Sequence, residues 1–381
     1  MDLNVEYFDG GDKEALDVIL RGSSQGMETS ESVQKIFKAA KDLGRSVAMF
    51  NSPFIDRGEK HREDQSRDEE IETLKSILDK CESGEYKKIR LIGKSLGGIV
   101  AAEYLTGLSK KDQEKYELVI LGFIPGATKV NNIVSKIIIF QGEKDRYGDV
   151  EAVRKEVGAV TENITIYGIS GADCSFNDPV TGEAKYFDKV LELLFINQKL
   201  EKELPQKGRK RVVRIEPVIQ KFNYDCGGAA VSNLLLMLGK GDVLKTELYQ
   251  RLEVDPVNGT RIKNIKKLLD EEGVEYFEAS GAGITELEAV LAVGYVCLVC
   301  YQAWGTEDEM DTLESGHYSV VFDVDETNVW FIDPSVLKED EVGEGIGVIF
   351  RSREDFDKRW RDKGVEGEIY DHWMLAVKVP Y

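Results

Sequence analysis

The stretch Ile89-Arg-Leu-Ile-Gly-Lys-Ser-Leu-Gly-Gly-Ile-Val100 decides how the first half of the chain folds. Its apolar run Ile89–Ile92 predicts a buried β-strand, and the small and apolar residues Gly97–Leu105 predict a helix. The glycines between these two segments permit a sharp turn that most residues cannot adopt. A strand that turns directly into a helix is typical of a sheet whose strands are connected by helices.

The same alternation of strand and helix patterns extends over residues 1–200, which we predict to be one domain. The predicted strands are Leu16–Leu20, Val47–Phe50, Ile89–Ile92, Leu118–Phe123, Ile137–Phe140 and Ile164–Ile169, and the predicted helices are Glu31–Leu43, Glu69–Lys80, Gly97–Leu105, Val150–Val157 and Ala184–Leu200. Alternating strands and helices imply right-handed crossovers. The expected class is therefore α/β, with a mostly parallel sheet covered by helices on both faces.

A change of pattern separates this region from the rest of the chain. Residues 201–213 are polar and contain Pro205 and Gly208, so we predict an interdomain linker there. In residues 214–381, helical patterns come first (226–239, 260–272 and 285–293) and strand patterns follow (295–301, 318–324, 329–332, 347–350 and 374–379). Helices followed by strands predict an α+β domain with an antiparallel sheet.

Composition and charge exclude several classes of protein. The 381 residues contain 50 Lys and Arg against 70 Asp and Glu, a net charge of −20, which disfavours binding to the phosphate backbone of nucleic acids. No apolar run approaches the roughly 20 residues that cross a bilayer. The N-terminal residues lack a signal-peptide pattern, and five scattered cysteines fit reduced thiols. We therefore expect a cytoplasmic protein; the sequence does not decide its oligomeric state.

Ser95 is the first candidate catalytic residue. In Gly93-Lys-Ser-Leu-Gly97, between a strand and a helix, it has the context of a nucleophile elbow, and the amide of Leu96 is a candidate oxyanion donor. A glycine-rich turn without catalytic function is the alternative.

Residues 1–200 resemble the α/β-hydrolase fold, in particular its small dienelactone-hydrolase-like members. The resemblance implies that the loop Arg21–Ser24 supplies the second oxyanion amide and that Asp145 is the acid of the triad. At the position of the family's histidine the sequence has Cys174, and the remaining histidine of this half, His61, lies in a charged segment that predicts a solvated loop. A thiol is a poor base for Ser95. We therefore predict a hydrolase fold without the standard triad.

A second constellation follows the linker and centres on Cys226. The cysteine opens an apolar helix, where the helix dipole and free amides favour a thiolate, and Gln220 is close enough in sequence to donate its amide to an oxyanion. His317 begins one predicted strand, and Asp333 follows the next. A hairpin of this length can bring Asp333 beside His317, to orient its ring.

Residues 214–378 resemble the papain-like fold, specifically the bacteriocin-processing (double-glycine leader) peptidase-like superfamily. The resemblance implies that Cys226 is the nucleophile, His317 the general base, Asp333 the orienting acid and Gln220 the oxyanion donor. The sequence departs from that superfamily at Gly228, where proline is usual, and in having no membrane segment or nucleotide-binding motif of a transporter. The resemblance therefore does not identify the substrate of this chain. A structural cysteine and a core histidine in an inactive relative form the alternative interpretation.

Three further features carry weaker signals. Cys297 and Cys300 are interpreted as core thiols, because residues three apart in a strand face opposite sides and no second pair completes a metal site. His372 is interpreted as structural. The acidic stretch Glu307–Glu314 is too polar for a strand, and we predict a loop over the cleft that favours basic substrates, with plain solubility as the alternative.

The sequence therefore favours a thiol hydrolase, a cysteine peptidase or amidase that acts through an acyl-enzyme on Cys226. The first domain is expected to position a peptide or amide substrate or a partner. No cofactor, metal, nucleic acid or membrane is implied. Two alternatives remain open: transfer of the acyl group to an amine at the same site, as in an acyltransferase or transpeptidase, and a non-catalytic scaffold of two binding domains.

Overall fold

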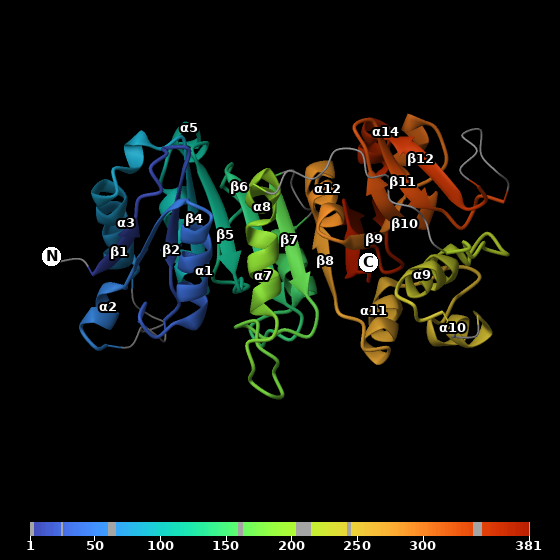
Figure 1. Ribbon diagram of the computed structural model, residues 1–381, viewed down its shortest axis with the longest axis horizontal. Helices are drawn as coiled ribbons and strands as arrows, with labels where there is room; N and C mark the ends of the chain where they lie inside the picture. Colours follow the sequence, from blue (N-terminus) through green and yellow to red (C-terminus); the bar gives the residue numbers. More distant parts are fainter. Residues whose placement is uncertain are drawn as a thin grey trace. The chain divides into compact units, whose positions relative to one another are not determined.

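The computed structural model divides into two compact units, Met1–Lys199 and Leu200–Tyr381 (Figure 1). It describes residues 4–23, 26–59, 66–158, 163–202, 215–241, 245–337 and 345–380. Most of the predicted linker, from residue 203 onward, and the candidate base His61 lie outside these described residues.

The first unit is built on a seven-stranded sheet. Its strands are β1 (Val5–Phe8), β2 (Ala15–Leu20), β3 (Ser46–Phe50), β4 (Lys88–Lys94), β5 (Tyr116–Leu121), β6 (Lys136–Gly142) and β7 (Ile164–Ile169), in the order β1-β3-β2-β4-β5-β6-β7. All neighbours are parallel except β1, which is antiparallel to β3. The predicted mostly parallel sheet is therefore confirmed, and the edge strand β1 is an element that the sequence pattern did not reveal.

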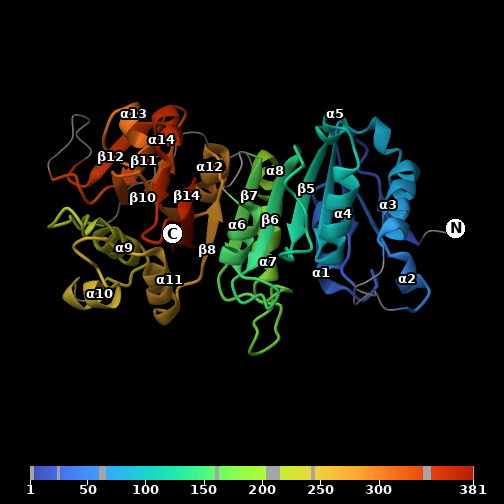
Figure 2. The ribbon, with the colours of Figure 1, turned by 180° about the vertical axis from the view of Figure 1, so that it is seen from behind.

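Helices cover both faces of this sheet. They are α1 (Glu31–Asp42), α2 (Pro53–Asp56), α3 (Asp68–Lys80), α4 (Leu96–Thr106), α5 (Lys110–Gln113), α6 (Val150–Val157), α7 (Phe187–Leu194) and α8 (Ile196–Lys202). Helices α1 and α7 lie on one face, and the view from behind brings α3, α4 and α6 to the front (Figure 2). The single helix predicted over 184–200 is in fact the pair α7 and α8, which are separated at Phe195.

A buried ion cluster lies within the β2–β4 region of this unit. The carboxylate of Asp17 is fully buried and accepts hydrogen bonds from Arg45 (2.7 and 2.8 Å) and Arg90 (2.8 and 3.0 Å). Burial alone raises the pKa of Asp17, but the two guanidinium groups overcome this effect and hold it below its usual value. Arg90 also donates to the carbonyl of Leu194 and stacks on Phe195, so the cluster joins the sheet to the end of α7.

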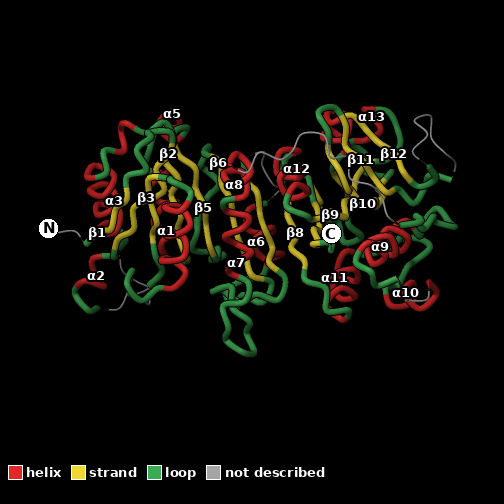
Figure 3. The backbone as a smooth tube through the Cα atoms, in the orientation of Figure 1, coloured by secondary structure: helices red, strands yellow, loops and turns green. Residues whose placement is uncertain are grey.

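The second unit contains a six-stranded antiparallel sheet. Its strands are β8 (Tyr276–Ser280), β9 (Tyr295–Gln302), β10 (Gly316–Val324), β11 (Asn328–Ile332), β12 (Val348–Ser352) and β15 (Met374–Lys378), in the order β8-β15-β9-β10-β11-β12 (Figure 3). A separate ribbon pairs β13 (Arg361–Lys363) with β14 (Ile369–Asp371). The predicted antiparallel sheet is confirmed.

The helices of the second unit are α9 (Cys226–Met237), α10 (Lys245–Arg251), α11 (Ile262–Glu271), α12 (Ile284–Ala292), α13 (Glu307–Met310) and α14 (Arg353–Arg359). Helix α9 packs against β10, with Val231 and Leu234 in a core shared with Val320. The order is not simply helices before strands, because β8 precedes α12 and α14 follows β12. The short polar helices α10 and α14 and the strand β8 had no clear sequence signal.

We expect Asp17→Asn to destabilise the first unit by about 3 to 5 kcal/mol, because it leaves two guanidinium groups facing a neutral amide in a buried site. Urea unfolding followed by the circular dichroism of the helices measures this loss. Glu14→Gln is the control, since the Glu14–Lys87 pair is exposed and its removal should change stability little. Equal losses of unfolding free energy in the two variants would show that the buried cluster stabilises the unit no more than an exposed ion pair does.

Candidate active sites

Cys226 is the first residue of α9, and the loop before it is fixed by one buried carboxylate. Asp225 accepts hydrogen bonds from the backbone N–H groups of Lys221 (3.1 Å) and Phe222 (3.0 Å) and from the hydroxyl of Tyr249 (3.1 Å). These bonds hold the turn that delivers the chain into α9. The Cys226 thiol therefore lies at the positive end of the helix dipole, directly after a turn that these hydrogen bonds hold in place.

Gly228 is the position at which the sequence departs from the resembled superfamily, and the structure gives a packing reason. A Cβ atom at Gly228 would lie 2.6 Å from the ring of Tyr249, the same tyrosine that binds Asp225. Glycine therefore allows Tyr249 to support the loop before Cys226, and a proline here requires a smaller partner.

His317 and Asp333 come together because β10 and β11 form the predicted antiparallel hairpin. His317 Nε2 lies 2.9 Å from Asp333 Oδ1, and both side chains are buried. Burial lowers the pKa of His317, but the hydrogen bond and charge of Asp333, together with the neighbouring Cys226, raise it to about 9. The other ring nitrogen, Nδ1, is buried and has no hydrogen-bond partner among the described residues. The ring is thus anchored at Nε2 and interacts with Cys226 besides Asp333.

Asp333 is surrounded by hydrogen-bond donors. Besides His317, it accepts from the Tyr301 hydroxyl (3.0 Å), the Ser319 hydroxyl (3.0 Å) and both the N–H and hydroxyl of Ser335 (2.8 and 2.6 Å). Burial opposes ionisation, but His317 and these donors outweigh it and hold the pKa of Asp333 well below its usual range. The carboxylate is therefore charged at neutral pH.

Gln220 lies between the cysteine loop and the Asp333 turn. Its backbone N–H donates to the carbonyl of Pro334 (2.9 Å), and its Nε2 donates to the carbonyl of Phe222 (2.8 Å). A side-chain amide carries two hydrogens, so this contact leaves a second N–H group for another acceptor. Gln220 is thus bonded to the loop before Cys226 and to the turn after Asp333, and His317 interacts with both Asp333 and Cys226.

Several neighbours of His317 were not found by sequence reasoning. Trp304 is half-exposed and its ring lies 4.9 Å from the imidazole, while the buried ring of Tyr301 lies 5.9 Å away in an edge-to-face arrangement. Together they enclose the imidazole, which is 1% exposed. Tyr301 and Ser319 occupy strands that pair in register beside His317, but no motif marks them, because any aromatic or small residue fits such strands.

The acidic stretch before His317 is the predicted loop only in its second half, from Asp311 to Glu314. Residues Glu307–Met310 form α13, with a capping box between Thr306 and Glu309. Glu307 pairs with Lys358 (3.2 Å), and Asp311 pairs with Arg361 (3.6 Å). A Thr-x-x-Glu pattern favours such a helical turn. Three of these carboxylates are therefore engaged with groups of the same chain.

The environments of Cys297, Cys300 and His372 are consistent with structural roles. Cys297 and Cys300 are fully buried in β9, and all five cysteines of the chain are thiols. His372 lies 3.0 Å from Asp371 and 3.4 Å from Asp357. Among the described residues, no three His, Cys, Asp or Glu side chains are placed to hold a metal ion, and no helix is long and apolar enough to cross a membrane.

In the first unit, Ser95 lies at the sharp turn between β4 and α4. Its backbone has φ 48° and ψ −109°, a conformation that is costly for any residue with a side chain. The turn is tight because Gly97 packs directly on the backbone of Leu20 and Arg21, where a Cβ atom has no room. The serine hydroxyl is therefore held at a strained strand-to-helix corner, as the sequence motif predicts.

Ser95, Asp145 and Cys174 converge around Gly122. A Cβ atom built on Gly122 would lie 3.6 Å from Ser95 Oγ, 3.8 Å from Asp145 Oδ2 and 3.4 Å from the carbonyl of Cys174. Burial raises the pKa of both the Asp145 carboxyl and the Cys174 thiol. A Cβ atom built on Gly22 would lie 4.0 Å from Ser95 Cβ, so the first part of the predicted oxyanion loop is near the serine. Ser24 of that loop is outside the described residues. The Ser95 hydroxyl and the Asp145 carboxylate are therefore close together, and the backbone carbonyl of Cys174 lies near them.

Comparison with known proteins identifies the first unit. Residues 14–193 match the family model of the alpha/beta hydrolase domain, so this part of the chain is an α/β-hydrolase domain, a hydrolase-type fold. No curated protein matches the chain. The match ends before Cys226, and the papain-like resemblance of the second unit stays a prediction.

Solved structures similar to this chain include three bacterial proteins. A putative alpha/beta hydrolase from Agrobacterium tumefaciens is 18% identical, with a TM-score of 0.42, and the match covers 53% of this chain and 93% of that one. An alpha-beta serine hydrolase homologue from Coxiella burnetii is 22% identical, with a TM-score of 0.41 and coverages of 51% and 91%. A serine hydrolase without a lid from Xanthomonas campestris is 15% identical, with a TM-score of 0.41 and coverages of 54% and 91%.

The His317–Asp333 pair predicts a pH dependence of stability. The pKa of folded His317 is raised from 6.5 to about 9, so its ion pair stabilises the unit fully below pH 6.5 and is lost as the pH rises through 9. We expect the free energy of unfolding to fall by roughly 3 kcal/mol more in the wild type than in His317→Gln over this interval. All four tryptophans belong to the second unit, so their fluorescence reports its unfolding selectively. If the free energy of unfolding changes with pH in the same way in both proteins, the His317–Asp333 ion pair is contradicted.

Proposed function

We propose that this protein is a thiol hydrolase, a cysteine peptidase or amidase, whose active site consists of Cys226, His317 and Asp333. The observation that carries the proposal is the buried His317–Asp333 pair, with the imidazole anchored at Nε2 (2.9 Å from Asp333), Nδ1 left without another described partner, and the partly exposed Cys226 near enough to act on the pKa of His317. A structural histidine has no need for an unpartnered buried nitrogen, whereas a general base requires one.

In the proposed reaction, His317 Nδ1 takes the proton of Cys226, and the thiolate attacks the substrate carbonyl carbon. Asp333 holds the Nε2 hydrogen and stabilises the imidazolium that forms. The N–H of Cys226 and the second amide hydrogen of Gln220 are the proposed donors to the oxyanion. His317 then protonates the leaving amine, and a water molecule releases the acid from the acyl-enzyme by the same base.

The surroundings of the pair support this chemistry. The start of α9 favours negative charge on the Cys226 sulfur, and the buried charge of Asp333 favours the positive form of His317. Trp304 and Tyr301 enclose the imidazole, which strengthens its electrostatic coupling to Asp333 because water is excluded. Both positions therefore suit the charges that the proposed reaction requires.

The α/β-hydrolase domain is proposed to position a peptide or amide substrate, or a partner, rather than to carry the main reaction. Its serine and acid are close. The resemblance to the family implies that Cys174 stands where that family has its histidine, and a thiol is a poor base. The preference for basic substrates is not carried further, because the acidic groups near α13 pair with basic residues of the chain itself.

The first test measures the reactivity of Cys226. If the thiolate–imidazolium pair forms, iodoacetamide should alkylate Cys226 well below pH 8.5, the ordinary pKa of a thiol. His317→Ala should slow the alkylation at pH 6 by roughly tenfold or more, and Cys226→Ala should remove the product from the peptide map.

Cys174 is the internal control for this experiment, because it is also partly exposed but burial raises its pKa. Alkylation of Cys226 no faster than that of Cys174 at pH 6 would falsify the proposal and favour the non-catalytic scaffold. Adding an amine such as glycinamide to a turnover assay separates the two enzymatic alternatives, since conjugates form only when the acyl group is transferred.

A second test concerns Ser95. Because the described residues of the first unit include no histidine, a fluorophosphonate probe should label Ser95 weakly or not at all, and Cys174→His should increase the labelling. Mass spectrometry of the intact protein measures the labelling of the wild type and of Cys174→His, with Ser95→Ala as the blank. Strong labelling of the wild-type serine would show that another base, with His61 the first to examine, serves this site.

A further inference from the structure

Two exposed aromatic side chains lie beside the two reacting residues of the proposed site. Among the described residues of the second unit, Phe222 (55% exposed) and Trp304 (50% exposed) are the most exposed aromatic side chains. Phe222 precedes Cys226 by four residues, and the ring centroid of Trp304 lies 4.9 Å from that of His317. Single exposed apolar residues are ordinary on a protein surface, but apolar groups gathered at one site mark a surface that a ligand covers.

The Phe222 ring belongs to an ordered loop. Its backbone N–H donates to the buried carboxylate of Asp225 (3.0 Å), and its carbonyl accepts the side-chain amide of Gln220 (2.8 Å). The ring also stacks on Tyr224, with 4° between the planes and 5.2 Å between the centroids. Because Gln220 is a proposed donor to the oxyanion, Phe222 directly contacts a residue of the proposed active site.

Trp304 stands in a loop that two arginines hold by its backbone carbonyls. Arg351 donates to the carbonyl of the residue before Trp304 (2.6 Å), and Arg359 donates to the carbonyl of the residue after it (3.1 Å). Asp355 pairs with both guanidinium groups (2.9 and 2.8 Å). Hydrogen bonds from charged groups are stronger than neutral ones, so the loop keeps the Trp304 ring beside the imidazole.

The placement of the two rings indicates which part of a substrate they contact. In the proposed acyl-enzyme, the acyl part of the substrate stays attached to the Cys226 sulfur, so its first side chain lies close to the loop of Phe222 and to the neighbourhood of His317. A ring that is already ordered binds an apolar group without a further loss of conformational entropy. Large apolar side chains therefore gain most at this surface, because they cover the most ring area.

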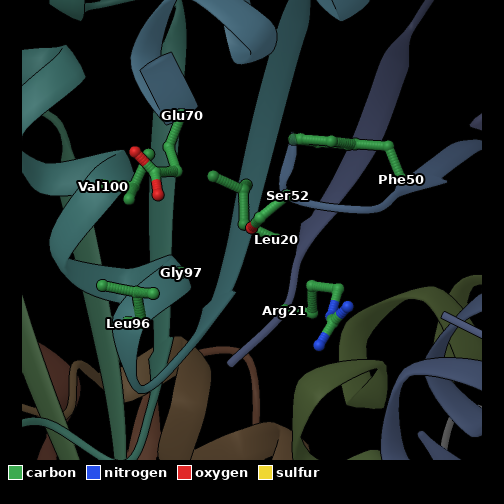
Figure 4. Close-up of a pocket in the computed structure, with 8 residues that line it drawn as sticks. All are labelled: Leu20, Arg21, Phe50, Ser52, Glu70, Leu96, Gly97 and Val100. Carbon is green, nitrogen blue, oxygen red and sulfur yellow. The ribbon is translucent and has the colours of Figure 1, made fainter. Parts of the chain in front are cut away.

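The pocket beside the Ser95 corner of the first unit does not serve this role. Leu96, Gly97 and Arg21 are among the residues that line it (Figure 4). The pocket has room for about one water molecule. A large side chain of a substrate does not fit there, so its recognition is assigned to the surface around Cys226.

We propose that Phe222 and Trp304 determine the specificity of the Cys226 site, and that the substrate is a peptide or amide whose acyl part carries a large apolar or aromatic side chain. This inference rests on the proposed thiol hydrolase function. The side chain packs on the two rings and leaves water, which supplies the binding free energy. A substrate with a small side chain leaves both rings exposed and reacts slowly.

The experiment compares two probes that differ only in this side chain, N-acetylphenylalanyl and N-acetylalanyl chloromethyl ketone. With both probes, the Cys226 sulfur forms a bond to the methylene carbon and chloride leaves. Peptide mapping of the full-length protein measures the rate of this modification at Cys226. We expect the phenylalanyl probe to react at least about tenfold faster, because burial of a phenyl ring favours binding by more than this factor.

Variants of the two aromatic residues test their part in this preference. Phe222→Ala and Trp304→Ala should each reduce the ratio of the two rates, and the double variant should react at nearly equal rates with both probes. Trp304→Phe keeps an aromatic ring and should retain most of the preference. Tyr147→Ala is the matched control, since it removes an exposed aromatic side chain of the first unit and should leave the ratio unchanged.

The comparison of the two probes on the wild-type protein does not depend on whether a variant folds. Equal rates with both probes, while Cys226 is reactive toward iodoacetamide at pH 6, overturn this inference alone and leave the proposed function in place. If Cys226 also fails the iodoacetamide test, both are overturned. An undiminished preference in the double variant shows that other residues recognise the side chain, and it overturns the inference as well.

Discussion

The second unit depends on a single buried carboxylate, that of Asp333. It accepts hydrogen bonds from His317 and Ser319 on β10, from Tyr301 on β9 and from Ser335 in the following turn. A buried charge is tolerated only when it is paired and hydrogen-bonded, so these groups must occupy fixed positions whenever Asp333 is ionised. The same constraint that orders three segments of the sheet also orients the imidazole and sets its affinity for a proton.

The two units solve one problem, the precise placement of a nucleophile, in different ways. In the first, backbone geometry does so: a strained turn held by glycine-to-backbone packing places Ser95 at a corner. In the second, polar contacts do so: the carboxylate of Asp225 fixes the loop that leads to Cys226. The first arrangement lacks an imidazole among its described residues, and the second has one, which is why the thiol site carries the proposed reaction.

The sequence predicts the periodic parts of both units well. Buried parallel strands such as β5 and β6 contain continuous apolar runs, and the hairpin that joins His317 to Asp333 follows from its length alone. The elements that the sequence does not predict are too short to show a period: β1 is an edge strand of four residues, and α13 is a four-residue helix that only its Thr306–Glu309 capping pattern indicates. The contacts of Trp304 and Tyr301 depend on tertiary packing, which residue spacing does not encode.

The packing of Gly228 against Tyr249 limits how this loop can be redesigned. Because a Cβ atom at position 228 collides with the tyrosine ring, the two positions cannot change independently without loss of the contact between Tyr249 and Asp225. A larger residue at position 228 therefore requires a smaller one at position 249, and Asp225 then requires another hydrogen-bond donor. The two positions must be exchanged together.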